Sequence, residues 1–196
     1  MKLYAFFISL LLVSIFSGCK KSGDSKEIEI ACDTSNTVFH QLYSNLVNTS
    51  PNLDDVTFDL ETHSYTFEVT APATICTVGY QSLPNFNTTP YLIEIVNNTS
   101  GVTEYSGSHL FSATTTSYVA INPVVLVVGD SYTIRRIQTN WNGNIVNTIG
   151  RLVYNPNGNL NFPIVNGILK ITGSSFYGTG GPDNNWSLPF IDIVFQ

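Results

Sequence analysis

Polar and apolar side chains alternate along much of the chain after residue 56. In the segment 63–70, Tyr65, Phe67 and Val69 fall on one face, and Thr66 and Glu68 fall on the other. This two-residue period is that of a β-strand with one buried face. Comparable short segments cover residues 27–31, 74–80, 91–96, 102–105, 108–111, 117–121, 124–128, 131–138, 148–154, 164–171 and 190–195.

Turn-forming residues separate these segments. They are Asn97-Asn98, Ser106-Gly107, Gly129-Asp130, Asn142-Gly143, Asn157-Gly158 and Gly180-Gly181-Pro182. Short strands at this spacing predict an all-β protein built as an antiparallel β-sandwich or a barrel. Because no repeat or boundary interrupts residues 27–196, we expect a single β-sandwich domain over that range.

One segment departs from the β pattern. In residues 35–47 the apolar side chains recur at helical spacing, at Val38, Phe39, Leu42, Tyr43, Leu46 and Val47. Thr34, Ser35 or Asn36 could cap the start of a helix there. The pattern therefore predicts one short amphipathic helix near the beginning of the domain, packed on a sheet.

The first residues of the chain have the order of an export signal. Met1-Lys2 is cationic, residues 3–16 are apolar, and the small residues Ser17 and Gly18 follow. The apolar stretch is shorter than the roughly 20 residues that a membrane-spanning helix needs. We therefore expect residues 1–18 to be a signal peptide.

The tetrapeptide Phe16-Ser17-Gly18-Cys19 resembles the bacterial lipobox, the motif of lipoprotein signal peptidase. The resemblance covers only the start of the chain, and Phe16 departs from the usual aliphatic residue. It implies cleavage before Cys19 and lipidation of that cysteine, which would anchor the protein durably in a membrane. An ordinary secretory signal with a chance cysteine is the alternative.

Residues 19–26 would then be the lipidated cysteine and a flexible tether, because the segment is polar and has no apolar periodicity. Residue 20 is Lys, whereas an Asp directly after the acylated cysteine resembles a signal for retention in the inner membrane. The expected location is therefore the cell envelope, at the outer membrane, with the membrane as a partner through the lipid anchor.

The composition suits an exported β-protein. Charged residues make up 11% of the chain and hydrophobic residues 43%, so a core can form and an intrinsically disordered chain is disfavoured. The formal net charge of −6, without a basic stripe, counts against a nucleic-acid partner.

Cys32 and Cys76 remain once Cys19 carries lipid. An even pair in an oxidising compartment predicts a disulfide, and two buried free thiols are the alternative. The histidines, His40, His63 and His109, have no ligand-like spacing. We therefore expect no metal site and no cofactor.

Residues 123–134 contain an apolar strand, Gly129, and a second strand with Tyr132 and Ile134 on one face. This segment resembles the penultimate hairpins of jelly-roll sandwiches, including many carbohydrate-binding modules. Such domains often end on an apolar strand, as residues 190–195 do. The resemblance implies a jelly-roll-like sandwich and transfers no ligand residue.

Arg135 and Arg136 are adjacent on a predicted strand, so one of them must share a face with Tyr132 and Ile134. We expect a structural pair between an arginine and a carboxylate, Asp192 or Glu94, at the edge of the core. The alternative is an arginine that grips an anionic ligand.

The acidic residues Asp54, Asp55, Asp59 and Glu61 form the acidic cluster of the sequence. A solvated loop or a loose calcium site fits this cluster better than the paired carboxylates of a glycoside hydrolase. The sequence contains no Gly-x-Ser-x-Gly motif, no His-Glu-x-x-His motif and no phosphate-binding glycine loop, and we name no catalytic residue.

The strongest candidate for ligand binding is aromatic. Trp141 lies in a predicted turn, and Tyr177, Asp183 and Trp186 lie in or beside an Asn-rich and Gly-rich loop. Aromatic rings can stack on sugars while polar neighbours bind hydroxyl groups. The alternative is that both tryptophans cover the ends of the core.

Three functions remain open at this point. The first is a non-catalytic accessory, structural or interaction module at the cell envelope, with an envelope protein as partner. The second is a glycan-binding lipoprotein of an outer-membrane uptake system. The third, and the least supported, is a hydrolase.

Overall fold

The computed structural model describes residues 32–57, 60–82, 89–141, 150–178 and 180–196. The predicted signal peptide, Cys19, the tether and the predicted strand 27–31 lie outside these ranges. Within them a single helix is followed by strands: α1 (Val38–Val47), β1 (Leu53–Thr57), β2 (Thr62–Val69), β3 (Ala73–Tyr80), β4 (Tyr91–Asn97), β5 (Val102–His109), β6 (Ser117–Leu126), β7 (Tyr132–Gln138), β8 (Gly150–Tyr154), β9 (Ile164–Asn166), β10 (Leu169–Tyr177), β11 (Asp183–Asn184), β12 (Ser187–Pro189) and β13 (Asp192–Phe195).

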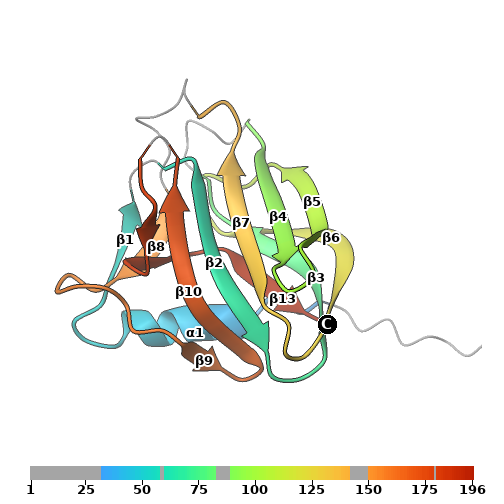
Figure 1. Ribbon diagram of the computed structural model, residues 1–196. Helices are drawn as coiled ribbons and strands as arrows, with labels where there is room; N and C mark the ends of the chain where they lie inside the picture. The colour runs from blue at the N-terminus through green and yellow to red at the C-terminus, as the bar shows by residue number, and fades with distance from the viewer. Residues whose placement is uncertain (1–31, 58–59, 83–88, 142–149, 179) are drawn as a thin grey trace, which may run out of the picture.

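The strands form an antiparallel β-sandwich, which confirms the predicted fold class. The largest sheet has the order β11-β10-β2-β7-β4-β5, with β9 also paired to β10. Two three-stranded sheets, β1-β8-β12 and β13-β3-β6, complete the fold. Figure 1 shows β3 and β13 behind the large sheet, with α1 near its lower end beside β9.

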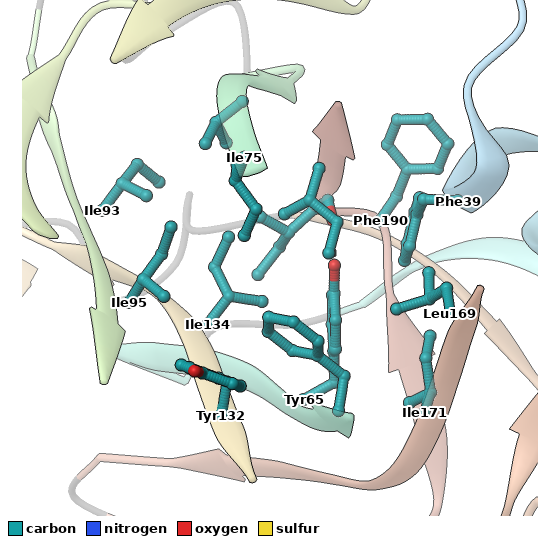
Figure 2. Close-up of a cluster of buried hydrophobic side chains, with 14 of the residues drawn as sticks. Phe39, Tyr65, Ile75, Ile93, Ile95, Tyr132, Ile134, Leu169, Ile171 and Phe190 are labelled. Atoms are coloured by element: carbon teal, nitrogen blue, oxygen red, sulfur yellow. Dashed lines mark hydrogen bonds between the residues drawn. The ribbon is translucent and has the colours of Figure 1, made fainter. Parts of the chain in front are cut away.

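The core lies between the sheets and is rich in aromatic rings. Tyr65 stacks on Phe39 of α1, with ring centroids 5.3 Å apart, and its hydroxyl donates a hydrogen bond to the Ile191 carbonyl at 2.8 Å. Phe190 packs edge-on against Phe39. Figure 2 shows these rings together with isoleucines from β3, β4, β7 and β10, so helix and sheets share one core.

The predicted helix is present, but its cap is Thr37. The Thr37 Oγ1 accepts a hydrogen bond from the His40 N–H at 2.9 Å, and the same hydroxyl donates to the carboxylate of Asp192 at 2.8 Å. Thr34, Ser35 and Asn36 were therefore the wrong candidates for the cap. Thr37 is the cap because its hydroxyl also reaches the carboxylate of Asp192 at the start of β13, a residue that is distant in the sequence.

Two predicted boundaries between strands lie inside continuous strands: the turn at Gly107, and the break between the predicted strands 117–121 and 124–128. Residues 102–105 and 108–111 were expected to flank a turn, but Gly107 lies within β5, where a Cβ atom would collide with the Tyr105 hydroxyl. Similarly, β6 runs through Pro123. The pairing of β6 with β3 shifts register there, and β6 is the edge strand of its sheet, where a missing backbone N–H is tolerated.

Two further predictions are corrected. The predicted strand 164–171 is split by a turn at Gly167 (φ 53°) into the antiparallel strands β9 and β10. The predicted hairpin in residues 123–134 is instead a crossing between sheets, because β6 pairs with β3 while β7 pairs with β2 and β4. Gly129 (φ 92°) provides the turn in that crossing.

The predicted disulfide is present between Cys32 and Cys76, with Cα atoms 6.2 Å apart. Cys76 lies on β3, at the point where the pairing of this strand with both of its neighbours shifts register. The bond therefore attaches the segment before α1 to the middle strand of the β13-β3-β6 sheet.

We predict that replacing both cysteines, Cys32→Ala and Cys76→Ala, lowers the free energy of unfolding by about 4 kcal/mol, because the bond closes a long loop. Urea unfolding of the mature domain measures this, and reduction of the unchanged protein should give a similar loss. An unchanged midpoint in the double variant would show that the bond does not stabilise the domain.

Asp192 gives a second prediction. Burial raises the pKa of its carboxyl to about 6, although hydrogen bonds from Thr37 and Tyr118 oppose this shift. The folded state therefore holds a proton that the unfolded chain releases near pH 4. This contribution to stability is present below pH 4 and is lost as the pH rises to 6.

The variant Asp192→Asn should not show this loss of stability with rising pH, because its side chain does not titrate. Between pH 4 and pH 7 we expect the free energy of unfolding of the unchanged protein to fall by about 2 kcal/mol relative to the variant. Urea titrations of both proteins at the two pH values test this, because the other carboxylates contribute equally to both. Parallel pH profiles would contradict it.

Candidate functional site

The structure brings together two of the four predicted ligand-binding residues. Asp183 on β11 and Trp186, just before β12, line one hollow of about 310 Å³ at the edge of the large sheet, together with Asn159, Pro182 and Asn184. The hollow therefore combines one half-buried indole with amide and carboxylate groups.

Strand pairing sets the position of Trp186. β12 pairs with β8 so that Ser187 lies opposite Tyr154, and the Trp186 ring stacks on the Tyr154 ring with centroids 5.3 Å apart. On the other side, β11 pairs with the end of β10. The indole is thus supported by a second aromatic ring at the junction of two sheets.

A second hollow, of about 460 Å³, adjoins the first at Asn184. Its lining residues carry hydroxyl and amide groups almost throughout: Thr66, Thr172, Gly173, Ser174, Ser175, Asn184 and Asn185. The Asn185 Oδ1 accepts a hydrogen bond from the Ser174 N–H at 3.0 Å, beside the register shift at Gly173. Across both hollows, Asp183 is the sole charged residue among those that line them.

The other two predicted residues lie elsewhere. Trp141 is 6% exposed, and Gly178 lies against its indole ring. It therefore belongs to the end of the core, as the alternative interpretation proposed. Tyr177 is half-buried and contacts Arg135. Burial alone would lower the pKa of Arg135, but its interactions with Tyr177 and Glu94 outweigh burial, so this pKa lies above its ordinary value.

The side chains of Arg135 and Arg136 lie on opposite faces of β7, as the alternation along a strand requires. Arg135 forms an ion pair with Glu94 at 2.6 Å on the outer face of the large sheet. An arginine–carboxylate pair is therefore present, but it does not involve the inward-facing arginine for which it was expected. Asp192 does not take part in such a pair; it binds Thr37 and Tyr118 instead. Arg136 is the inward-facing member and is fully buried.

Among the described residues, no carboxylate forms an ion pair with Arg136, whose partners are aromatic rings and neutral groups. Its guanidinium lies over the rings of Tyr80 and Tyr91, 5.6 and 5.2 Å from their centroids. It donates hydrogen bonds to the His63 Nδ1 at 2.6 Å and to the Glu61 carbonyl at 3.4 Å.

His63 is suited to accept this bond. Burial lowers the pKa of His63 well below its ordinary value, and the positive charge of Arg136 lowers it further. A hydrogen bond with the Leu60 backbone opposes this shift but does not cancel it. The imidazole is therefore neutral, with Nδ1 as an acceptor. The alternation in the sequence places an arginine in phase with Tyr132 and Ile134, but no sequence pattern indicates His63 as its partner.

The acidic cluster is only partly described. Arg151 holds Asp54 through two nitrogens, Nε at 3.0 Å and Nη2 in an ion pair, and the Tyr43 hydroxyl donates to the same carboxylate at 2.8 Å. These groups border a hollow of about 290 Å³ with Asp55, Gln81 and Ser82 in its lining. Asp59 lies outside the described residues.

Within the described ranges, no three His, Cys, Asp or Glu side chains are placed to hold a metal ion. In the same ranges, no helix has the length and apolar character needed to cross a membrane. Comparison with known protein families and with curated proteins finds no match for this chain.

The two adjacent arginines give a matched test of the structure. Arg136→Ala removes a fully buried side chain, two aromatic contacts and the donor for His63, so we expect a loss of about 3 kcal/mol or more in the free energy of unfolding. Arg135→Ala removes a partly exposed ion pair and should cost about 1 kcal/mol or less. Urea unfolding measures both, and equal losses would contradict the assigned faces.

Proposed function

We propose that the protein is a lipoprotein of the bacterial cell envelope, anchored at the outer membrane through Cys19, whose β-sandwich is a non-catalytic glycan-binding module. The lipobox-like tetrapeptide at residues 16–19 supports the anchor. The Cys32–Cys76 disulfide supports export, because such bonds persist mainly in oxidising compartments.

The observation that carries the binding function is the hollow at Trp186. Sugar rings have apolar faces that stack on aromatic side chains and hydroxyl edges that need hydrogen-bond partners. Trp186, supported by Tyr154, offers the stacking ring, and Asn159, Asp183 and Asn184 offer amide and carboxylate groups in the same hollow. The adjoining hydroxyl-rich hollow extends this surface for a second sugar unit.

The same surface disfavours hydrolysis by paired carboxylates. Such a mechanism needs two carboxyl groups that flank the scissile bond at about 5–10 Å from each other. Asp183 is the single carboxylate among the residues that line the two hollows. A binding role, in which the protein holds a glycan for a partner in the envelope, therefore fits this site better than a catalytic one.

The test is a glycan array probed with the mature chain from Lys20 onward. We expect binding to a defined set of glycans, and Trp186→Ala should weaken that binding about tenfold, because one stacking contact contributes roughly 1 kcal/mol or more. Asn184→Ala should also weaken it, since it removes an amide shared by both hollows.

The matched control is Asn45→Ala, a change from amide to methyl at an exposed position of α1. It should leave binding unchanged, and circular dichroism should show the same fold in all variants. A chain that binds no glycan, or a Trp186→Ala variant that binds as well as the unchanged protein, would contradict the proposed function.

A further inference from the structure

Four valines with exposed side chains lie in or near the turns at one end of the sandwich. Val102, Val125, Val127 and Val128 are 51%, 71%, 55% and 49% exposed. We call these four residues the valine surface. The nearby turns, residues 70–72, 97–101 and 127–131, contain Asp130 as their single charged residue.

Hydrogen bonds hold the valine surface in place. The Asn98 N–H donates to the Ser131 carbonyl at 2.7 Å, and the Ser131 N–H donates to the Thr99 hydroxyl at 3.0 Å, so the turns 97–101 and 127–131 are joined. The Val127 N–H donates to the Tyr132 hydroxyl at 2.8 Å. The one charge, Asp130, accepts a hydrogen bond from the Asn97 amide at 2.8 Å.

The described part of the chain begins near this surface. Cys32, the first described residue, is bonded to Cys76 on β3, and the residues just before Cys76 pair with β6: Thr74 lies opposite Val125. Figure 1 shows the connection from β6 to β7 at the side of the molecule where β3 and the C-terminus lie. Residues 20–31 separate Cys32 from the anchor and span about 45 Å at most.

We infer that the valine surface docks onto the lipid bilayer to which Cys19 is anchored. This inference rests on the proposed lipid anchor. A rigid, exposed apolar surface marks an interaction site, and the short tether keeps this one close to the bilayer at all times. Because the surface has no basic residue, insertion of valine side chains and not attraction to anionic headgroups drives the contact.

Docking by this end has a consequence for the glycan site. The strand β11 pairs with β10 at Ser175 and Phe176, and Phe176 lies opposite His63, which in turn lies opposite Arg136 near the end of β7. The turn 127–131 lies before the start of β7, at the opposite end of this strand. Contact with the bilayer through the valines therefore leaves the hollow at Trp186 open to the aqueous side.

The test compares two valines of nearly equal exposure. Val127→Cys and Val56→Cys, at positions 55% and 59% exposed, each introduce one thiol for an environment-sensitive fluorophore. Val56 lies on β1, in a different sheet from β6. The full chain is produced in a diderm host, purified with its lipid, and placed in phosphatidylcholine vesicles that contain brominated acyl chains.

We expect the fluorophore at residue 127 to be quenched several-fold more strongly than the one at residue 56, with no change on addition of salt. Equal quenching of the two in a lipidated protein would overturn docking and leave the anchor intact. Mass spectrometry of Cys19 distinguishes the other failure, because an unacylated cysteine overturns the anchor and the inference with it. Shielding of residue 127 in native envelopes but not in pure vesicles would assign the surface to a protein partner and overturn bilayer docking.

Discussion

The strict alternation of β7 is the constraint on which the rest of the structure depends. Tyr132, Ile134, Arg136 and Gln138 all face the interior, and β7 is paired on both sides, with β2 and β4. A shift of β7 by one residue would expose Tyr132 and Ile134 and would bury Arg135 away from its partner Glu94, which would stay on the outer face of β4. The register therefore places Arg136 in the core, and the surrounding residues must accommodate a buried cation.

The accommodation of Arg136 explains several features of its surroundings. Tyr80 and Tyr91 reach it from two different sheets, and His63 accepts its hydrogen bond from the neighbouring strand. Gly150 lies directly against His63 and the Tyr80 hydroxyl, where a Cβ atom would meet both at about 3 Å. These contacts connect the large sheet with β3 and β8, while the ring of Trp186 lies at the edge of the same framework, on Tyr154 of β8.

Local patterns predicted the strands and the helix because their signals are local. The alternation in β2 and β7 and the helical spacing in α1 needed no knowledge of distant residues. The cap at Thr37 and the crossing between β6 and β7 depend on partners far along the chain, so no local pattern could predict them. The strand β5 continues across Gly107 because it pairs there with β4, where Ile93 lies opposite Gly107.

At the candidate site, too, the sequence shows the type of residue, but only the fold shows which residues lie together. Trp141 and Trp186 both lie in Asn-rich segments and look equivalent in the sequence. Strand pairing separates them: the first is covered at the end of the core, and the second is stacked on Tyr154 at a sheet edge beside Asp183. Asn159 was not a predicted site residue, because only the fold brings its loop to this hollow.

The central claim, a glycan site at Trp186, is tested most directly by following the two indole N–H signals in the NMR spectrum of the mature domain while a bound glycan is titrated. The buried Trp141 serves as the internal reference. The account predicts that the Trp186 signal shifts with saturation and that the Trp141 signal stays in place. Saturable binding that leaves the Trp186 signal unmoved would contradict it.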